Sequence, residues 1–208
     1  SMAYKELLIK KKEAVAIIKF NRPGQMNAVN TQLSGELVDA LLSIDRDTGI
    51  KVVIITGVGH AFSAGIDIPE LLENPFLSSF ENKVPTQMSV PWIPLILRQM
   101  KKPVIASING VAVGAGFSIA LACDIRIASE KAKMGAPFGR VGLMPEFGST
   151  YNLPRLVGIG KACELIFTGD MIEPKEMMEI GLVNRVVPAE KLEEFTFQMA
   201  KKIAKWPA

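Results

Sequence analysis

Histidine and cysteine are scarce in this chain: its 208 residues include one histidine, His60, and two cysteines, Cys123 and Cys163. A single histidine excludes a histidine-rich metal site and leaves a Ser-His-Asp triad only one candidate base. Two cysteines are too few for a disulfide-stapled scaffold and fit a reducing compartment. We therefore expect no metal site and a cytoplasmic location.

An excess of one charge and a long apolar run are also missing. Lys and Arg number 24 against 21 Asp and Glu, and the net charge of +3 is too small to imply a nucleic-acid partner. The most apolar stretch, residues 104–122, contains three glycines, two serines and an asparagine, which is typical of a buried strand, a turn and a helix rather than a membrane span. The first residues show no secretory signal. We expect neither a nucleic acid nor a membrane as partner.

The composition, 49% apolar and 22% charged, is that of a globular domain. A run of β-branched residues predicts a buried strand at Val52–Thr56, and a second buried strand is predicted at Val104–Ile108; each leads into a glycine-rich loop and then a helix. This pattern indicates an α/β protein of repeated ββα-like units. Further strands are predicted at Leu7–Lys10, Val15–Phe20 and Ile125–Ala128, and further helices at Thr31–Ile44, Ala115–Cys123, Ser149–Leu156, Gly160–Phe167, Pro174–Ile180 and Ala189–Lys205.

The two glycine-rich loops, Gly59–Ile68 and Asn109–Ser118, carry most of the chemical signal. Small residues let a ligand approach the backbone, and free N–H groups at a helix start favour negative charge. Two such loops could aim two donors at one oxyanion, each worth roughly 3 kcal/mol. Glycines that only form turns are an equally good interpretation of the composition alone. A dinucleotide fingerprint is weak, because Ile119 takes the third glycine position and Ala136 the place of the acid.

Five stretches occur in order between Phe20 and Pro188: A-F-S-A-G-I-D, K-P-V-I-A-S-I-N-G-V-A-V-G-A-G, A-C-D-I-R-I-A-S-E-K-A-K-M-G, L-P-R-L-V-G and I-G-L-V-N-R-V-V-P. This combination resembles the enoyl-CoA hydratase/isomerase (crotonase) superfamily. The resemblance implies a crotonase-like spiral of repeated ββα units with C-terminal helices, assembled as a homotrimer or hexamer. It implies an acyl-CoA thioester substrate with no separate cofactor, and a single domain over residues 1–208 that lacks the final C-terminal helices of the family.

The resemblance also assigns the site residues. By the match to family positions, the two oxyanion donors are the backbone N–H groups of Ile66 and Ala115. Arg22 matches a basic position near the CoA phosphates, although a turn residue is an alternative interpretation. The positions expected to bind substrate are Arg22, Ala64, Gly65, Asp67, Gly114, Gly116 and Phe138.

Departures from the family pattern point to the reaction. Family hydratases carry two glutamates, where this chain has Ser118 and Phe138. Water addition needs a base and an acid, so the loss of both carboxylates argues against hydration. Glu146 instead stands where family hydratases have glycine, as in the Δ3,Δ2-enoyl-CoA isomerase branch. We expect Glu146 to remove a proton from C2 of a 3-enoyl thioester and to return it at C4.

Several alternatives remain open at this point. The same family includes hydratases and other thioester-enolate enzymes, and a non-catalytic acyl-CoA binding protein would keep the fold with Glu146 facing water. Met144 and Phe147 are expected to desolvate Glu146 and to raise its pKa. His60 and Glu70 are expected at the surface, and Asp67 is expected to tie loops together. Two interpretations are equally good for Phe76, Phe80, Met88 and Trp92: they line a tunnel for the acyl chain, or they belong to the ordinary core.

Overall fold

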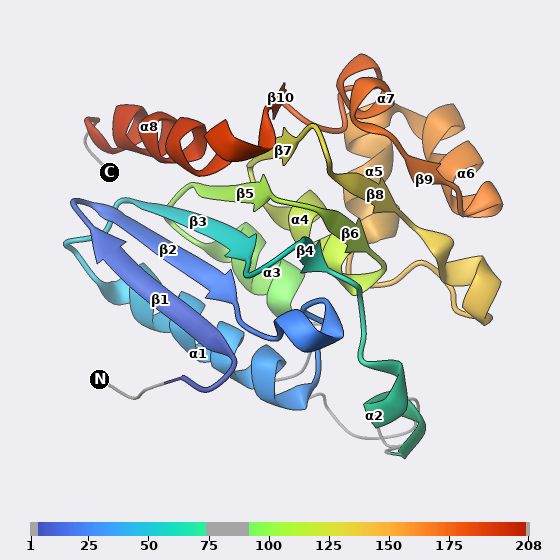
Figure 1. Cartoon of the computed structure of the whole chain (residues 1–208), viewed down its shortest axis with the longest axis horizontal. Helices are drawn as coiled ribbons and strands as arrows, with labels where there is room; N and C mark the ends of the chain where they lie inside the picture. The colour runs from blue at the N-terminus through green and yellow to red at the C-terminus, as the bar shows by residue number, and fades with distance from the viewer. Residues whose placement is uncertain (1–3, 74–91, 207–208) are drawn as a thin grey trace.

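The computed structural model describes residues 4–73 and 92–206. Its larger sheet has the strand order β1-β2-β3-β5-β7-β10 (Figure 1). Strand β1 pairs antiparallel with β2, and every other neighbouring pair in this sheet is parallel. The bounds are β1 Leu7–Lys12, β2 Val15–Phe20, β3 Val52–Gly57, β5 Val104–Ile108, β7 Ile125–Ser129 and β10 Arg185–Val187.

A second sheet, of short strands, has the order β4-β6-β8-β9. Its strands are β4 Ala61–Ser63, β6 Val111–Val113, β8 Lys133–Gly135 and β9 Met171–Ile172. The interpretation of these two glycine-rich segments as loops up to the following helices is therefore wrong, because each contains a three-residue strand that is too short to show alternation. The pairs β3–β4, β5–β6 and β7–β8 each give one strand to either sheet, so the predicted repeat of ββα-like units is confirmed.

Helices cover both faces of the larger sheet (Figure 1). Asn30 caps α1, where its side-chain oxygen accepts a hydrogen bond from Leu33 N (2.8 Å). Their bounds are α1 Thr31–Arg46, α2 Ile68–Glu73, α3 Trp92–Gln99, α4 Ala115–Ala122, α5 Ser149–Val157, α6 Ile159–Thr168, α7 Pro174–Glu179 and α8 Leu192–Ala204, with short 3-10 helices η1 Pro23–Gln25, η3 Pro137–Val141 and η4 Ala189–Lys191.

Two apolar cores lie on opposite faces of the larger sheet. In β2, Ile18 belongs to the main core, whereas Ile17 belongs to a smaller core covered by α8. Helix α8 buries Leu192, Thr196, Phe197 and Ala200. The spacing of Leu192, Phe195, Met199 and Ile203 predicts that they form the apolar face of this helix, and this prediction is partly wrong, since Phe195 is 37% exposed.

Within the described residues, none of the helices combines the length and the apolar character that a membrane crossing requires. The same residues contain no group of three or more His, Cys, Asp or Glu side chains arranged to hold a metal ion.

The two cysteines should differ sharply in reactivity. Cys123 is buried, and desolvation raises the pKa of its thiol to about 12, so the reactive thiolate is suppressed. Cys163 is exposed on α6. We expect a maleimide to modify only Cys163 in the native protein and both thiols after denaturation, as mass spectrometry would show. A Cys163→Ser variant that still reacts at the native rate would contradict this.

Candidate active site

The two glycine-rich segments meet at one edge of the smaller sheet. Strands β4 and β6 are parallel neighbours, so the loops that follow them emerge at the same end. A Cβ atom on Gly65 would lie 3.0 Å from Val113 O and 3.6 Å from Ala115 N. Gly65 and Gly114 both have positive φ, 97° and 53°, which favours glycine at each position. The structure therefore brings these two predicted loops into direct contact.

The two expected donors, the N–H groups of Ile66 and Ala115, lie in this region. Val29 pairs with the backbone around Ile66: its N–H donates to Gly65 O (2.7 Å), and its carbonyl accepts from Asp67 N (3.0 Å). Ala115 is the first residue of α4, so its N–H has no acceptor within the helix. Neither amide donates to an acceptor among the described residues, and both are available to a ligand oxygen.

Helix α4 packs directly onto β4. A Cβ atom on Gly116 would lie 2.6 Å from both Ser63 Cβ and Ser63 O. Ser63 Oγ in turn accepts a hydrogen bond from Gly65 N (3.2 Å). Gly116, expected among the substrate-binding positions, therefore has a packing role that fixes the start of α4 against the first loop.

Glu146 precedes α5, and its main chain is tied to α4. Its carbonyl accepts hydrogen bonds from Ser149 Oγ (2.7 Å), Ser149 N (3.0 Å) and Ser118 Oγ (3.3 Å). The single Ser118 hydroxyl proton is shared with Gly114 O, which lies 3.2 Å from Ser118 Oγ. The first turn of α4, which begins at Ala115, therefore holds the backbone of Glu146. This contact could not be expected from the sequence, in which Ser118 stands out only as the replacement of a family carboxylate.

The backbone after Glu146 is locally strained. Phe147 and Gly148 have φ values of 54° and 73°, and a left-handed residue other than glycine costs of order 1–3 kcal/mol. Such strain clusters at functional sites because the surrounding structure has to hold it in place. Here it turns the chain sharply between Glu146 and α5.

The Glu146 carboxyl is partly buried and has no hydrogen bond or ion pair among the described residues. Desolvation by burial raises its pKa, as expected. Phe147 packs against the main core, whereas Met144 is 70% exposed, so Phe147 is the better source of this desolvation. The raised pKa brings this unpaired carboxyl closer to the pH at which a general base can both accept and release a proton.

Arg22 and Asp67 form a structural ion pair. Arg22 Nη1 lies 2.9 Å from Asp67 Oδ2 and donates to Ala28 O (2.6 Å), while Nε lies 3.4 Å from Glu6 Oε1. Asp67 thus ties loops together, as expected. The assignment of Arg22 to the CoA phosphates stays a prediction, because its guanidinium is already held between two carboxylates.

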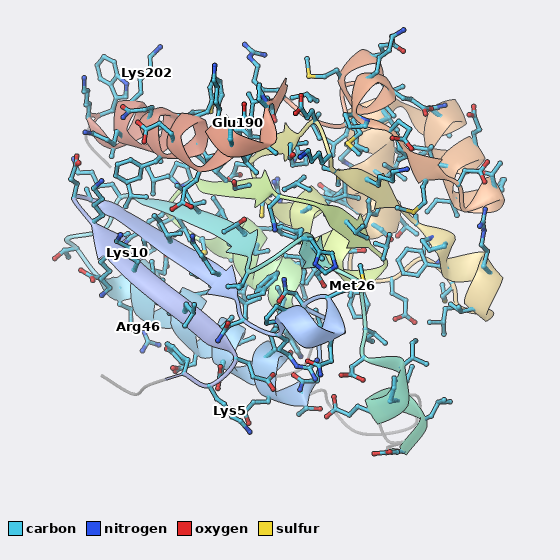
Figure 2. All side chains as sticks on the ribbon, viewed as in Figure 1. Lys5, Lys10, Met26, Arg46, Glu190 and Lys202 are labelled. Carbon is cyan, nitrogen blue, oxygen red and sulfur yellow. The ribbon has the colours of Figure 1, made fainter. Side chains whose placement is uncertain are left out.

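Most of the other expected residues fall within the described part of the chain. Ala64 N donates to Met26 O (2.9 Å), and Met26 lies beside η1 (Figure 2). Phe138 is buried in η3, and His60 is exposed as expected. Glu70 accepts from Thr31 N (3.0 Å) at the start of α1. Trp92 opens α3, whereas Phe76, Phe80 and Met88 lie outside the described residues.

Comparisons with known proteins agree with this architecture. The family model described as enoyl-CoA hydratase/isomerase matches residues 10–208. A crotonyl-CoA hydratase of Syntrophomonas wolfei is 42% identical over 192 residues, which are 92% of this chain and 72% of that protein. The crystal structure of an enoyl-CoA hydratase from Bacillus anthracis gives a TM-score of 0.86 at 38% identity, covering 96% of this chain and 77% of that one. A monofunctional enoyl-CoA isomerase from M. smegmatis gives 0.80 at 35% identity, covering 97% and 86%. These likenesses confirm the predicted crotonase-like α/β fold.

Proposed function

Because the chain belongs to the enoyl-CoA hydratase/isomerase family, we propose that it acts on acyl-CoA thioesters and moves the double bond of a 3-enoyl-CoA to the 2-position. One observation carries the choice of reaction. Glu146 presents a partly buried carboxyl without a partner among the described residues, on a loop anchored to the helix that begins at Ala115. A single carboxyl suffices for a 1,3-proton transfer, in which the same group takes and returns the proton.

The proposed reaction has two proton transfers and no net change in protonation. The Glu146 carboxylate removes a C2 proton, and the electron pair of that C–H bond delocalises into a dienolate. The thioester oxygen carries the negative charge and accepts hydrogen bonds from Ile66 N and Ala115 N, which cost no reorganisation because the backbone already holds them. The protonated carboxyl then donates to C4, which leaves the double bond between C2 and C3.

Hydration is the second candidate, because several relatives are named as hydratases. The side chains at the two family glutamate positions do not support it. The Ser118 hydroxyl is buried and bonded to two carbonyls, and Phe138 is a buried hydrocarbon. Hydration needs one group to activate water and one to protonate carbon. Glu146 could serve as one of them, but neither Ser118 nor Phe138 supplies a second carboxyl.

Separate assays with a 3-enoyl-CoA and a 2-enoyl-CoA test the proposal. We expect the double bond of the 3-enoyl substrate to shift and the 2-enoyl substrate to gain no water. Hydration of the 2-enoyl substrate at a comparable rate would favour the hydratase, and binding without turnover of either would favour a non-catalytic protein. The homotrimer or hexamer implied by the resemblance stays a prediction, which light scattering tests.

The contact between Ser118 and the Glu146 backbone makes Ser118 a positioning residue. In Ser118→Ala we expect kcat to fall about fivefold, the equivalent of one hydrogen bond of about 1 kcal/mol, with little change in KM. The control is Ser107→Ala, which removes a buried hydroxyl that contacts Thr196 Oγ1 (3.2 Å) under α8 and should leave kcat unchanged. An equal loss in both variants would contradict a specific role for Ser118.

The raised pKa of Glu146 sets the expected pH dependence of the reaction. The base must be ionised, so kcat/KM should fall as the pH drops through this pKa, and the fall should begin above the ordinary range of glutamate. A pH–rate profile measures it. A kcat/KM that stays flat into the ordinary glutamate range would contradict Glu146 as the base.

A further inference from the structure

A cavity of about 200 Å³ lies at the C-terminal end of α4. Leu121 and Cys123 line it, together with residues of α3, β7 and α5. Ala115 stands at the opposite end of the same helix, whose eight residues span about 12 Å. The cavity is smaller than the roughly 300–1,000 Å³ typical of sites for drug-sized ligands, so its size suits a small ion or a short metabolite.

The charge lining this cavity is unbalanced. Three guanidinium groups, Arg98, Arg126 and Arg155, face a single carboxylate, Asp124, which leaves a formal charge of +2. Asp124 Oδ2 already accepts a hydrogen bond from Val104 N (2.8 Å), and Oδ1 lies 3.9 Å from Arg98 Nη1. Neither Arg126 nor Arg155 forms an ion pair with any described residue, so the excess positive charge has no internal counterion.

Arg126 is buried, with only 4% of its surface exposed. Its Nε donates to Leu182 O (2.8 Å) and its Nη1 to Cys123 O (2.6 Å), and both acceptors are neutral carbonyls. The third nitrogen, Nη2, has no acceptor among the described residues. Arginine stays protonated in proteins, so this buried cation presents one unused donor edge at the cavity.

A second buried polar group lines the same cavity without a partner. Asn152 on α5 is 8% exposed, and its side-chain amide forms no hydrogen bond with a described residue. The amide is not fully enclosed by protein, so it stays open to a ligand in the cavity. One turn further along α5, Arg155 is held in place: its Nη1 donates to Tyr151 O (2.8 Å) and its guanidinium lies 3.5 Å from the Tyr151 ring centroid.

We propose that this cavity is a binding site for a small dianion, a phosphate group or a short dicarboxylate. A dianion neutralises the formal charge of +2 and accepts from Arg126 Nη2 and the Asn152 amide, which otherwise lack partners. The guanidinium fork matches the paired oxygens of carboxylates and phosphates alike. The bound dianion would link α3, β7 and α5 around the end of α4.

Calorimetric titration with inorganic phosphate and with malonate tests the proposal. The ionic strength is held constant so that general screening does not contribute. We expect saturable binding of at least one anion with one site per chain. Binding of phosphate alone assigns the site to a tetrahedral group, and binding of malonate assigns it to carboxylates. Saturable binding of neither overturns the proposal.

The variant that tests the location is Arg98→Gln with Arg155→Gln, since both guanidinium groups are exposed enough for removal without disturbing the core. Arg126 is left intact because its hydrogen bonds join backbone segments. We expect affinity to fall by about tenfold or more, since each charge-assisted hydrogen bond is worth about 1.5–3 kcal/mol.

The matched control is Arg46→Gln with Arg185→Gln, which removes the same charge from two exposed arginines outside the cavity. Arg46 lies on α1, on the far side of the molecule from α5 (Figures 1 and 2). We expect the control to bind as the unmodified protein does. Equal losses in the two double variants, or displacement of the anion by CoA, would overturn the proposal, the latter because the site would then belong to the substrate.

Discussion

Glu146→Gln should abolish isomerisation of a 3-enoyl-CoA, with kcat falling by about 10²–10⁴ as expected for the loss of a general base. The glutamine keeps the size and polarity of the side chain but cannot accept the C2 proton. CoA affinity should stay within a few-fold, because the oxyanion amides belong to Ile66 and Ala115 and are unchanged. Steady-state kinetics and CoA titration measure the two effects separately. Turnover retained near the level of the unmodified protein would reject Glu146 as the base.

The same substitution should not destabilise the protein at neutral pH. Burial raises the pKa of Glu146 in the folded state, so the folded state binds the proton more tightly than the unfolded state does. The contribution of Glu146 to stability is therefore full below its pKa in the unfolded state. It is lost as the pH rises through its pKa in the folded state. We expect Glu146→Gln to gain free energy of unfolding relative to the unmodified protein as the pH rises from acidic to neutral, measured by urea denaturation. A Glu146 carboxylate stabilised by a hydrogen bond or an ion pair in the folded state would give the opposite trend.

The central strands of the larger sheet could be predicted from sequence because they are buried on both faces. Val52–Thr56 is a continuous β-branched run and Val104–Ile108 is a run of apolar and small residues, and the structure has strands at Val52–Gly57 and Val104–Ile108. The smaller sheet could not be predicted. Its strands β4 and β6 are only three residues long, and neighbouring strands from distant segments stabilise them rather than local preference. The exposure of Phe195 also depends on distant segments, because the strands that pack against α8 determine which of its side chains are buried.

The sequence indicates which segments form the candidate site, but not how these segments are connected in space. The loops around Ile66 and Ala115 carry a visible glycine pattern, and Glu146 stands out where hydratases have glycine. The hydrogen bond from Ser118 to the Glu146 carbonyl crosses 28 residues of sequence, and no local pattern signals it. Arg22 likewise seemed free for a phosphate, whereas its actual partners, Glu6 and Asp67, come from separate segments.

Gly116→Ala should damage both stability and catalysis. The added Cβ would stand 2.6 Å from the main-chain oxygen of Ser63, and backbone cannot yield as a flexible side chain does. Helix α4 or strand β4 must therefore move, at a cost of about 1–3 kcal/mol in the free energy of unfolding. Any movement displaces the neighbouring Ala115 N–H from its position beside Gly65. Because loss of one oxyanion donor costs about 10²–10³ in kcat, we expect a loss of that order.

Gly160→Ala is the matched control for this substitution. Gly160 lies in α6, and its added Cβ would meet no atom within 4 Å. Alanine there should raise stability by about 0.4–1 kcal/mol, because it restricts the unfolded chain without strain, and kcat should not change. Thermal denaturation and steady-state kinetics on both variants test separately whether Gly116 is needed for packing and whether the Ala115 amide is needed for catalysis. If Gly116→Ala is destabilised but fully active, the packing of α4 on β4 still explains the loss of stability. The Ala115 amide would then have moved without an effect on kcat, which would contradict its role as an oxyanion donor.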